Sequence, residues 1–91
     1  MTRDPLSPEV FRRVAVVGTT AWGTTLAVHL ARNGAPTVLV ARDADEAAAL
    51  KRAGTNERRL PGVAFPEPLA VDAGGAGVAG ADLVVFAVPS G

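Results

Sequence analysis

The sequence predicts an α/β fold, with a parallel sheet of about four strands in the order 3-2-1-4 and helices on its faces. Short runs of valine, leucine and alanine recur along the chain between segments that carry glycine or proline, as in buried parallel strands. Segments with apolar residues at helical spacing follow the first two of these runs. A glycine-edged turn joins the first run to the first helix, which is typical of a nucleotide-binding strand-turn-helix unit.

The first unit consists of a strand over residues 14–17 and a helix over residues 21–33. Gly18 ends the strand, and Gly34 stands where a left-handed residue commonly ends a helix. The helical spacing rests on five apolar residues, namely Trp22, Leu26, Ala27, Leu30 and Ala31.

The turn inside this unit carries the pattern G-x-G-x-x-G with one substitution. Gly18 and Gly23 occupy the first and third glycine positions, which allow the tight turn and the close packing of helix on strand. Thr20 occupies the second, where its Cβ pushes a phosphate outward unless the loop shifts or the hydroxyl donates to the phosphate itself. A helix that begins at Ala21 or Trp22 points unpaired N–H groups at this place. The turn therefore predicts a Rossmann-type pyrophosphate site, with a purely structural turn as the alternative.

The second predicted strand, within residues 36–42, ends at Arg42, which lies nineteen positions after Gly23. In dinucleotide-binding folds this strand end reaches the adenosine ribose. An acidic residue there binds the ribose hydroxyls of NAD, whereas an arginine can hold the 2′-phosphate of NADP. Arg42 is therefore predicted to bind the cofactor and argues against FAD, with a solvated surface arginine as the alternative.

Asp43 is the next candidate for the ribose acid. However, Asp43 and Glu46 have the spacing of a helix N-cap and its capping partner, which favours capping of a helix over residues 44–53. Arg42 favours a 2′-phosphate and the adjacent Asp43 opposes it, so we expect use of both NAD and NADP.

The next stretch carries weaker signals. Residues 55–68 are predicted to form a loop in which Arg58 and Arg59 face either a phosphate or solvent. Residues 69–71 predict a short third strand. Residues 72–80 contain four glycines and predict a frayed helical turn or a loop.

The fourth strand is predicted over residues 83–88, and Pro89 turns the chain at its carboxyl end. In the order 3-2-1-4 this strand lies beside the first, which places a crevice above Gly18 and Pro89 together. Ser90 then faces the nicotinamide half of the cofactor or is an ordinary turn serine.

Composition restricts the classes of function. Ninety-one residues form one small domain at most, with a core of Val, Leu and Ala because only 4% of residues are aromatic. Nine acidic and nine basic residues balance, which argues against nucleic acid as a partner. The chain has no cysteine, and its single histidine, His29, is expected to be exposed, so no metal site is predicted. Residues 1–12 are expected to be a flexible leader rather than a signal peptide, no run approaches a membrane span, and the expected compartment is the cytoplasm.

Several segments together resemble one family, the bacterial NAD(P)-dependent glycerol-3-phosphate dehydrogenases, in their amino-terminal cofactor-binding part. The Ala-Trp-Gly-Thr run and the Leu-Pro-Gly loop carry the most specific likeness. The matching segments are residues 14–27, 29–34, 41–43, Asn56 with 60–62, and 80–85 with 88–90. The resemblance implies an enzyme that interconverts dihydroxyacetone phosphate and sn-glycerol 3-phosphate with NADH or NADPH, for phospholipid synthesis. It also implies a small-molecule substrate and allows a homodimer of the complete enzyme.

Carried over by position, the resemblance assigns Ala21 and Trp22 to the phosphate turn and Arg42 to the adenosine side. Two positions depart from the family, because Thr20 replaces a glycine and Arg59 replaces a common aromatic residue. The family's catalytic lysine and helical substrate domain follow the matched segment, and the only lysine, Lys51, matches no catalytic position. Residues 13–91 are therefore expected to be a truncated Rossmann domain that binds cofactor and carries no catalytic residue.

Two alternatives stay open at this stage. One is the amino-terminal part of a related reductase, such as a ketopantoate reductase, which shares the fold. The other is a non-enzymatic nucleotide-binding module, which would fold and act without a further domain.

Overall fold

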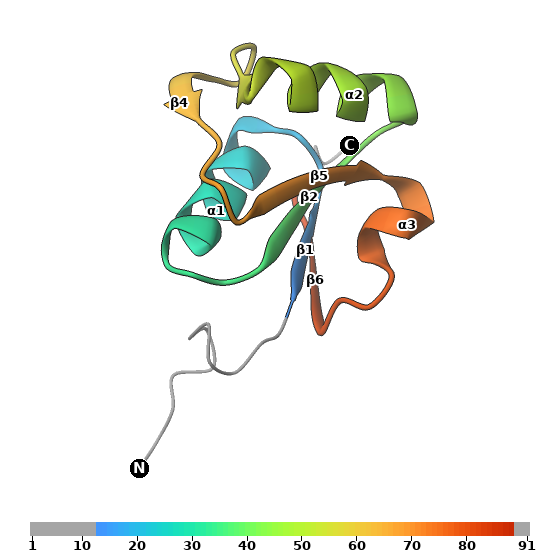
Figure 1. Cartoon of the computed structure of the whole chain (residues 1–91). Coiled ribbons are helices and arrows are strands. Elements are labelled where there is room, and N and C mark those ends of the chain that lie inside the picture. Colours follow the sequence, from blue (N-terminus) through green and yellow to red (C-terminus); the bar gives the residue numbers. More distant parts are fainter. Residues whose placement is uncertain (1–12, 89–91) are drawn as a thin grey trace.

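The computed structural model describes residues 13–88, and its main sheet has four parallel strands (Figure 1). These strands are β1 (Val14–Val17), β2 (Thr37–Ala41), β5 (Leu69–Ala73) and β6 (Leu83–Phe86). Their order is β5-β2-β1-β6, which confirms the predicted order 3-2-1-4. Val16 of β1 lies opposite Leu39 of β2 and Val85 of β6. The carboxyl ends of β1 and β2 therefore lie side by side at one edge of the sheet.

Helices cover both faces of this sheet. They are α1 (Ala21–Arg32), α2 (Ala44–Ala53) and α3 (Gly74–Val78). Figure 1 shows α1 and α3 on opposite sides of the strands. Side chains alternate accordingly: Val16 and Leu39 pack with α1, whereas Ala15 and Val38 belong to the cluster on the α3 side.

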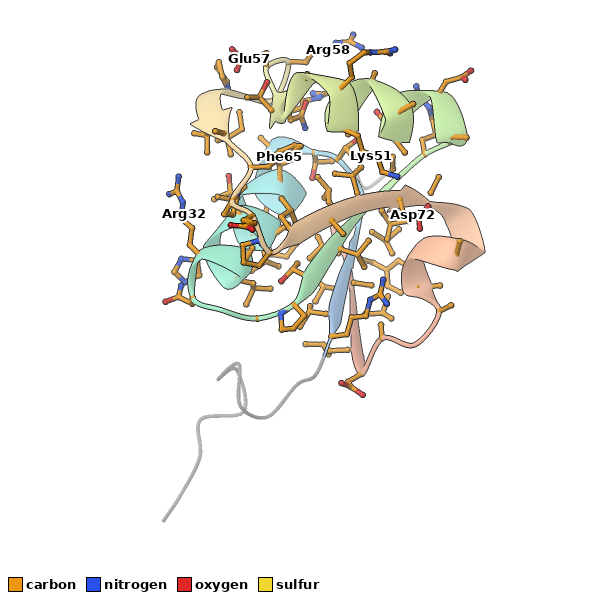
Figure 2. The ribbon with its side chains drawn as sticks, viewed as in Figure 1. Arg32, Lys51, Glu57, Arg58, Phe65 and Asp72 are labelled. Atoms are coloured by element: carbon orange, nitrogen blue, oxygen red, sulfur yellow. The ribbon has the colours of Figure 1, made fainter. Side chains whose placement is uncertain are left out.

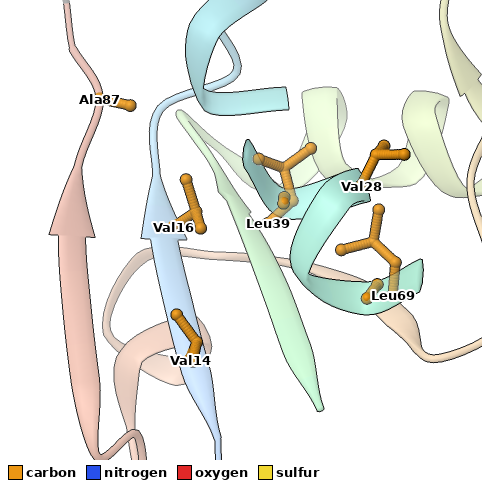
Figure 3. Packing of buried hydrophobic residues seen from close by; sticks show 8 residues of the cluster. Val14, Val16, Val28, Leu39, Leu69 and Ala87 are labelled. Carbon is orange, nitrogen blue, oxygen red and sulfur yellow. The ribbon is translucent and has the colours of Figure 1, made fainter. Parts of the chain in front are cut away.

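The core is built almost entirely from valine, alanine and leucine, as the composition predicted. Leu39 is fully buried at the centre of the sheet, and Figure 3 shows it between Val16 of β1 and Val28 of α1. Leu69 of β5 closes the same cluster. A second cluster joins Ala47 and Leu50 of α2 to the neighbouring strands. The apolar faces of α1 and α2 thus hold the first two strand-helix units against one sheet.

The prediction of a loop over residues 55–68 is wrong in part, because two short strands lie within it. β3 (Thr55–Asn56) and β4 (Leu60–Ala64) form a separate two-stranded antiparallel ladder. Pro61 is tolerated because such a pair has open edges that need no donor from it. The backbone N–H of Phe65 donates to the carbonyl of Gly54 at 2.8 Å, which ties the ladder to the end of α2.

Two smaller corrections concern strand bounds, and the glycine-rich segment takes the helical one of its two predicted forms. The third strand continues to Ala73, and the fourth ends at Phe86 instead of residue 88. The glycine-rich segment forms the short helix α3, in which a Cβ added to Gly77 would lie 2.8 Å from Cγ2 of Val40. Packing on the sheet therefore needs a small residue there and overrides the weak helix propensity of glycine.

Single residues also differ in their fit to the predictions. Trp22 has helical spacing with the core face of α1, yet 60% of it is exposed, because the buried face of α1 is formed by smaller residues. His29 and Lys51 are exposed, as predicted.

The predicted leader and the Pro89-Ser90 turn lie outside the described residues. In the described range, no helix has both the length and the apolar character needed to cross a membrane.

Candidate functional site

The turn between β1 and α1 is shaped by two glycines. Gly18 has a φ of +119°, and a Cβ there would overlap the carbonyl oxygen of Ala87 after β6. Gly23 lies inside α1, and a Cβ there would overlap the carbonyl oxygen of Gly18 and lie 2.9 Å from the Ala87 Cβ. The close approach of β1, α1 and β6 therefore requires glycine at both positions. This is the arrangement that the glycine pattern predicts.

Thr20 is the N-cap of α1. Its Oγ1 accepts a hydrogen bond from the Gly23 N–H at 3.0 Å and donates to the Ala87 carbonyl at 2.8 Å. The single hydroxyl proton is therefore directed at Ala87, so donation to a phosphate is not the arrangement seen here. The second glycine of the pattern lets the backbone approach the phosphates closely. Threonine at this position instead caps the start of α1.

The first turn of α1 still presents backbone donors. Gly23 is capped by Thr20, and the Thr24 N–H donates to the Thr20 carbonyl at 2.9 Å. By helix geometry the N–H groups of Ala21 and Trp22 have no intrahelical acceptor. These two groups and the positive end of the helix dipole are the features that attract an anion to such a turn.

A cleft of about 430 Å³ opens at the carboxyl ends of β1 and β2. One wall is the β1–α1 turn with Gly18 and Thr20, and another is the end of β2 with Arg42. The third wall is the turn between β3 and β4, which carries Arg58 and Arg59. The structure thus brings together the predicted glycine turn and the predicted adenosine-side arginine in one cleft.

Trp22 does not line this cleft. It lies beside Phe86 and Val88 around a neighbouring hollow of about 420 Å³, and all three side chains are exposed. Thr20 and Val88 line both hollows, so the two adjoin at the N-terminus of α1. A polar cleft and an apolar hollow therefore flank the same helix start.

Arg42 and Asp43 form an exposed ion pair at the end of β2, with 3.3 Å between the Arg42 Nε and the Asp43 Oδ2. The other Asp43 oxygen accepts the Glu46 N–H at 2.8 Å, which confirms its predicted role as the N-cap of α2. The Glu46 N–H first, and the Arg42 guanidinium next, hold the pKa of the Asp43 carboxyl below its ordinary value.

This lowered pKa predicts a pH-dependent stability. The ionised cap stabilises the fold fully above the unfolded pKa of about 3.9, and the contribution is lost as the pH falls through the lower folded pKa. The free energy of unfolding, measured with urea, should therefore fall more for the wild type than for Asp43→Asn between about pH 5 and about pH 2. Asparagine still caps the helix but cannot titrate. Parallel losses in the two proteins would contradict this role.

Glu46 and Asn56 are site residues that the sequence reasoning did not assign. Glu46 was expected to bond back to Asp43, but its Oε1 accepts the Arg42 N–H at 2.8 Å and its Oε2 accepts the Thr19 hydroxyl at 3.1 Å. Asn56 is buried, and its Nδ2 donates to the Thr19 carbonyl at 3.0 Å and to the Thr24 Oγ1 at 2.9 Å. Thr19, in the glycine turn, is thus held from two sides. The position of Asn56 just before the Leu-Pro-Gly loop was the only available signal.

Three other charged residues, Glu57, Lys51 and Asp72, do not line the cleft. Figure 2 shows Glu57 and Arg58 at the outer end of the β3–β4 turn, and the Glu57 Oε2 accepts the Gly62 N–H at 2.7 Å. Lys51 and Asp72 border a different hollow along β5. Among the residues that the structure describes, no group of three or more His, Cys, Asp or Glu side chains is placed to hold a metal ion.

A parallel sheet in the order 3-2-1-4, with a glycine turn and a cleft at its carboxyl edge, defines a Rossmann-type α/β domain. The chain belongs to the family described as NAD-dependent glycerol-3-phosphate dehydrogenase N-terminus, whose model matches residues 13–91. This confirms the family resemblance and favours it over the two alternatives.

Individual relatives agree with the family match. The chain is 42% identical over 80 residues to "Glycerol-3-phosphate dehydrogenase [NAD(P)+]" of Xanthomonas campestris pv. campestris (strain B100), covering 87% of this chain and 24% of that protein. It is 42% identical over 85 residues to the protein of that name from Sinorhizobium fredii (strain NBRC 101917 / NGR234), covering 92% and 26%. A crystal structure of glycerol-3-phosphate dehydrogenase from Coxiella burnetii matches with a TM-score of 0.80 and 34% identity, over 87% of this chain and 25% of that one. The chain spans about a quarter of the length of these relatives.

Proposed function

We propose that the chain binds NAD(H) or NADP(H) across the cleft at the carboxyl ends of β1 and β2. The pyrophosphate lies at the N-terminus of α1, near the Ala21 and Trp22 N–H groups, and the adenosine half extends over β2 towards Arg42. The observation that carries this proposal is the pair Gly18 and Gly23. A Cβ at either position would collide with neighbouring atoms where β1, α1 and the end of β6 pack closely together. The glycine turn and the cleft that it borders suit a dinucleotide in shape and in donor groups.

The activity that we propose for the complete enzyme is the interconversion of dihydroxyacetone phosphate and sn-glycerol 3-phosphate, for glycerophospholipid synthesis. The bound nicotinamide supplies the hydride, and this chain's residues bind and orient the cofactor. Neither hollow beside α1 is lined by a lysine or a histidine in the described residues, so we assign no catalytic residue among them. A homodimer and the cytoplasm remain the assembly and the compartment that we propose for the complete enzyme.

Trp22 provides a direct test of cofactor binding. It is the only tryptophan, and it lies on the first turn of α1 beside the apolar hollow. Titration with NADH is expected to quench its emission saturably and to produce nicotinamide emission by energy transfer. A competing titration with 5′-AMP should reverse the signal if the adenosine half occupies the cleft. A chain that circular dichroism shows to be folded, and that gives no quenching with NADH or NADPH, would contradict the proposal.

A further inference from the structure

Glu46 lies in the cleft, although its position on α2 and its spacing from Asp43 predicted only a capping role. It lies on the first turn of α2, is half-buried, and lines the cleft. Its carboxylate joins two parts of the site: one oxygen accepts the Thr19 hydroxyl at 3.1 Å, and the other accepts the Arg42 N–H at 2.8 Å. The Glu46 carboxylate therefore lies between the phosphate turn and the end of β2, which is the path of the adenosine ribose.

The two residues at the end of β2 that would ordinarily choose between the dinucleotides, Arg42 and Asp43, are paired with each other. Asp43 caps α2 with one oxygen and pairs with the Arg42 guanidinium through the other, and it does not line the cleft. Arg42 also lines the cleft, but its side chain is 77% exposed and its Nε donates to Asp43. Among the described residues that line the cleft, Glu46 is the only one with a carboxylate.

A carboxylate has about four acceptor sites, and two of those of Glu46 are used by the protein. The remaining sites suit a ribose hydroxyl, which can donate to them. A 2′-phosphate has no comparable donor and brings negative charge against negative charge in a partly buried cleft.

We propose that Glu46, from α2, takes the part of the ribose acid and makes the chain select NAD(H) over NADP(H). The inference rests on the proposed dinucleotide site and replaces the expected use of both cofactors with a preference for one. Arg58 and Arg59 line the same cleft from the β3–β4 turn, and both dinucleotides carry a pyrophosphate that such cations attract. Glu46 is the group that meets the one position at which the dinucleotides differ.

The test compares the dissociation constants of NADH and NADPH for the wild type, Glu46→Gln and Asp45→Asn. Gln keeps the size of the side chain and removes its charge. Asp45 lies on the same turn of α2, is exposed and does not line the cleft, so Asp45→Asn is a control for the loss of one acidic charge. We expect the wild type to bind NADH about tenfold more tightly than NADPH, and Glu46→Gln to reduce this ratio to about one. Asp45→Asn should leave the ratio within about threefold of the wild-type value.

A second measurement needs no variant. The 2′-deoxyadenosine analogue of NADH lacks the hydroxyl that donates to Glu46, and it should bind the wild type about tenfold more weakly than NADH. Equal binding of this analogue and NADH overturns the inference, as does an unchanged NADH-to-NADPH ratio in a folded Glu46→Gln protein. A wild type that binds neither cofactor overturns the proposed function itself, and the inference with it.

Discussion

Gly18→Ala is expected to remove most of the stability of this domain. The added Cβ would overlap the carbonyl oxygen of Ala87, lie 3.3 Å from the Val88 Cγ1, and force a side chain onto a φ of +119°. Backbone strain and the forced separation of β1 from β6 together are expected to cost about 3 kcal/mol or more. Domains of this size have only a few kcal/mol in total, on the order of 5. Urea unfolding followed by circular dichroism measures the loss.

Gly34→Ala is the matched control for this prediction. Gly34 also has a positive φ, of +90°, but a Cβ there meets no atom within 4 Å. It therefore introduces backbone strain without a collision, at about 1 kcal/mol. Equal losses in the two variants would show that strain alone acts at Gly18, and that the contact with Ala87 does not limit the turn.

Asn56→Asp is expected to have the second-largest effect, on both stability and cofactor binding. Asn56 is buried, and its amide donates to the Thr19 carbonyl and the Thr24 hydroxyl oxygen. Aspartate has the same shape but presents a carboxylate oxygen to the Thr19 carbonyl in place of a donor. The loss of stability is expected to be about 3 kcal/mol, since the buried charge loses its hydration and faces the Thr19 carbonyl oxygen.

The same substitution tests whether Asn56 positions the glycine turn for cofactor binding or only stabilises the fold. Asn56 acts through Thr19, in the glycine turn. The Asn56→Asp protein should therefore bind NADH more weakly than the wild type even at temperatures where both proteins are folded. Asn33→Asp is the control, since the exposed Asn33 amide also donates to a carbonyl, that of His29 at 2.8 Å, but far from the turn. It should cost about 1 kcal/mol or less and leave the affinity for NADH unchanged. Unaltered NADH binding by folded Asn56→Asp would refute the positioning role.

The sequence by itself determined the main sheet and the glycine turn. β1 is recognisable as a β-branched run that ends at a glycine, and α2 follows from the cap at Asp43 and ends at Gly54, which has a left-handed φ of +69°. These are local signals, because each depends on residues within a few positions of one another. The strand order then followed from the general rules of such folds, and the structure confirms it.

Only the tertiary structure decided which polar groups meet in the cleft. Thr19 bonds to Glu46, 27 positions away, and to Asn56, 37 positions away, while the Thr20 hydroxyl reaches the carbonyl of Ala87 across 67 positions. No periodicity or local motif encodes such pairs, because they form only when β1, β2, β6 and the β3–β4 ladder are brought together. Helical spacing places Glu46 on the first turn of α2, but strand packing alone turns that carboxylate towards the glycine turn, where we propose that it selects the cofactor.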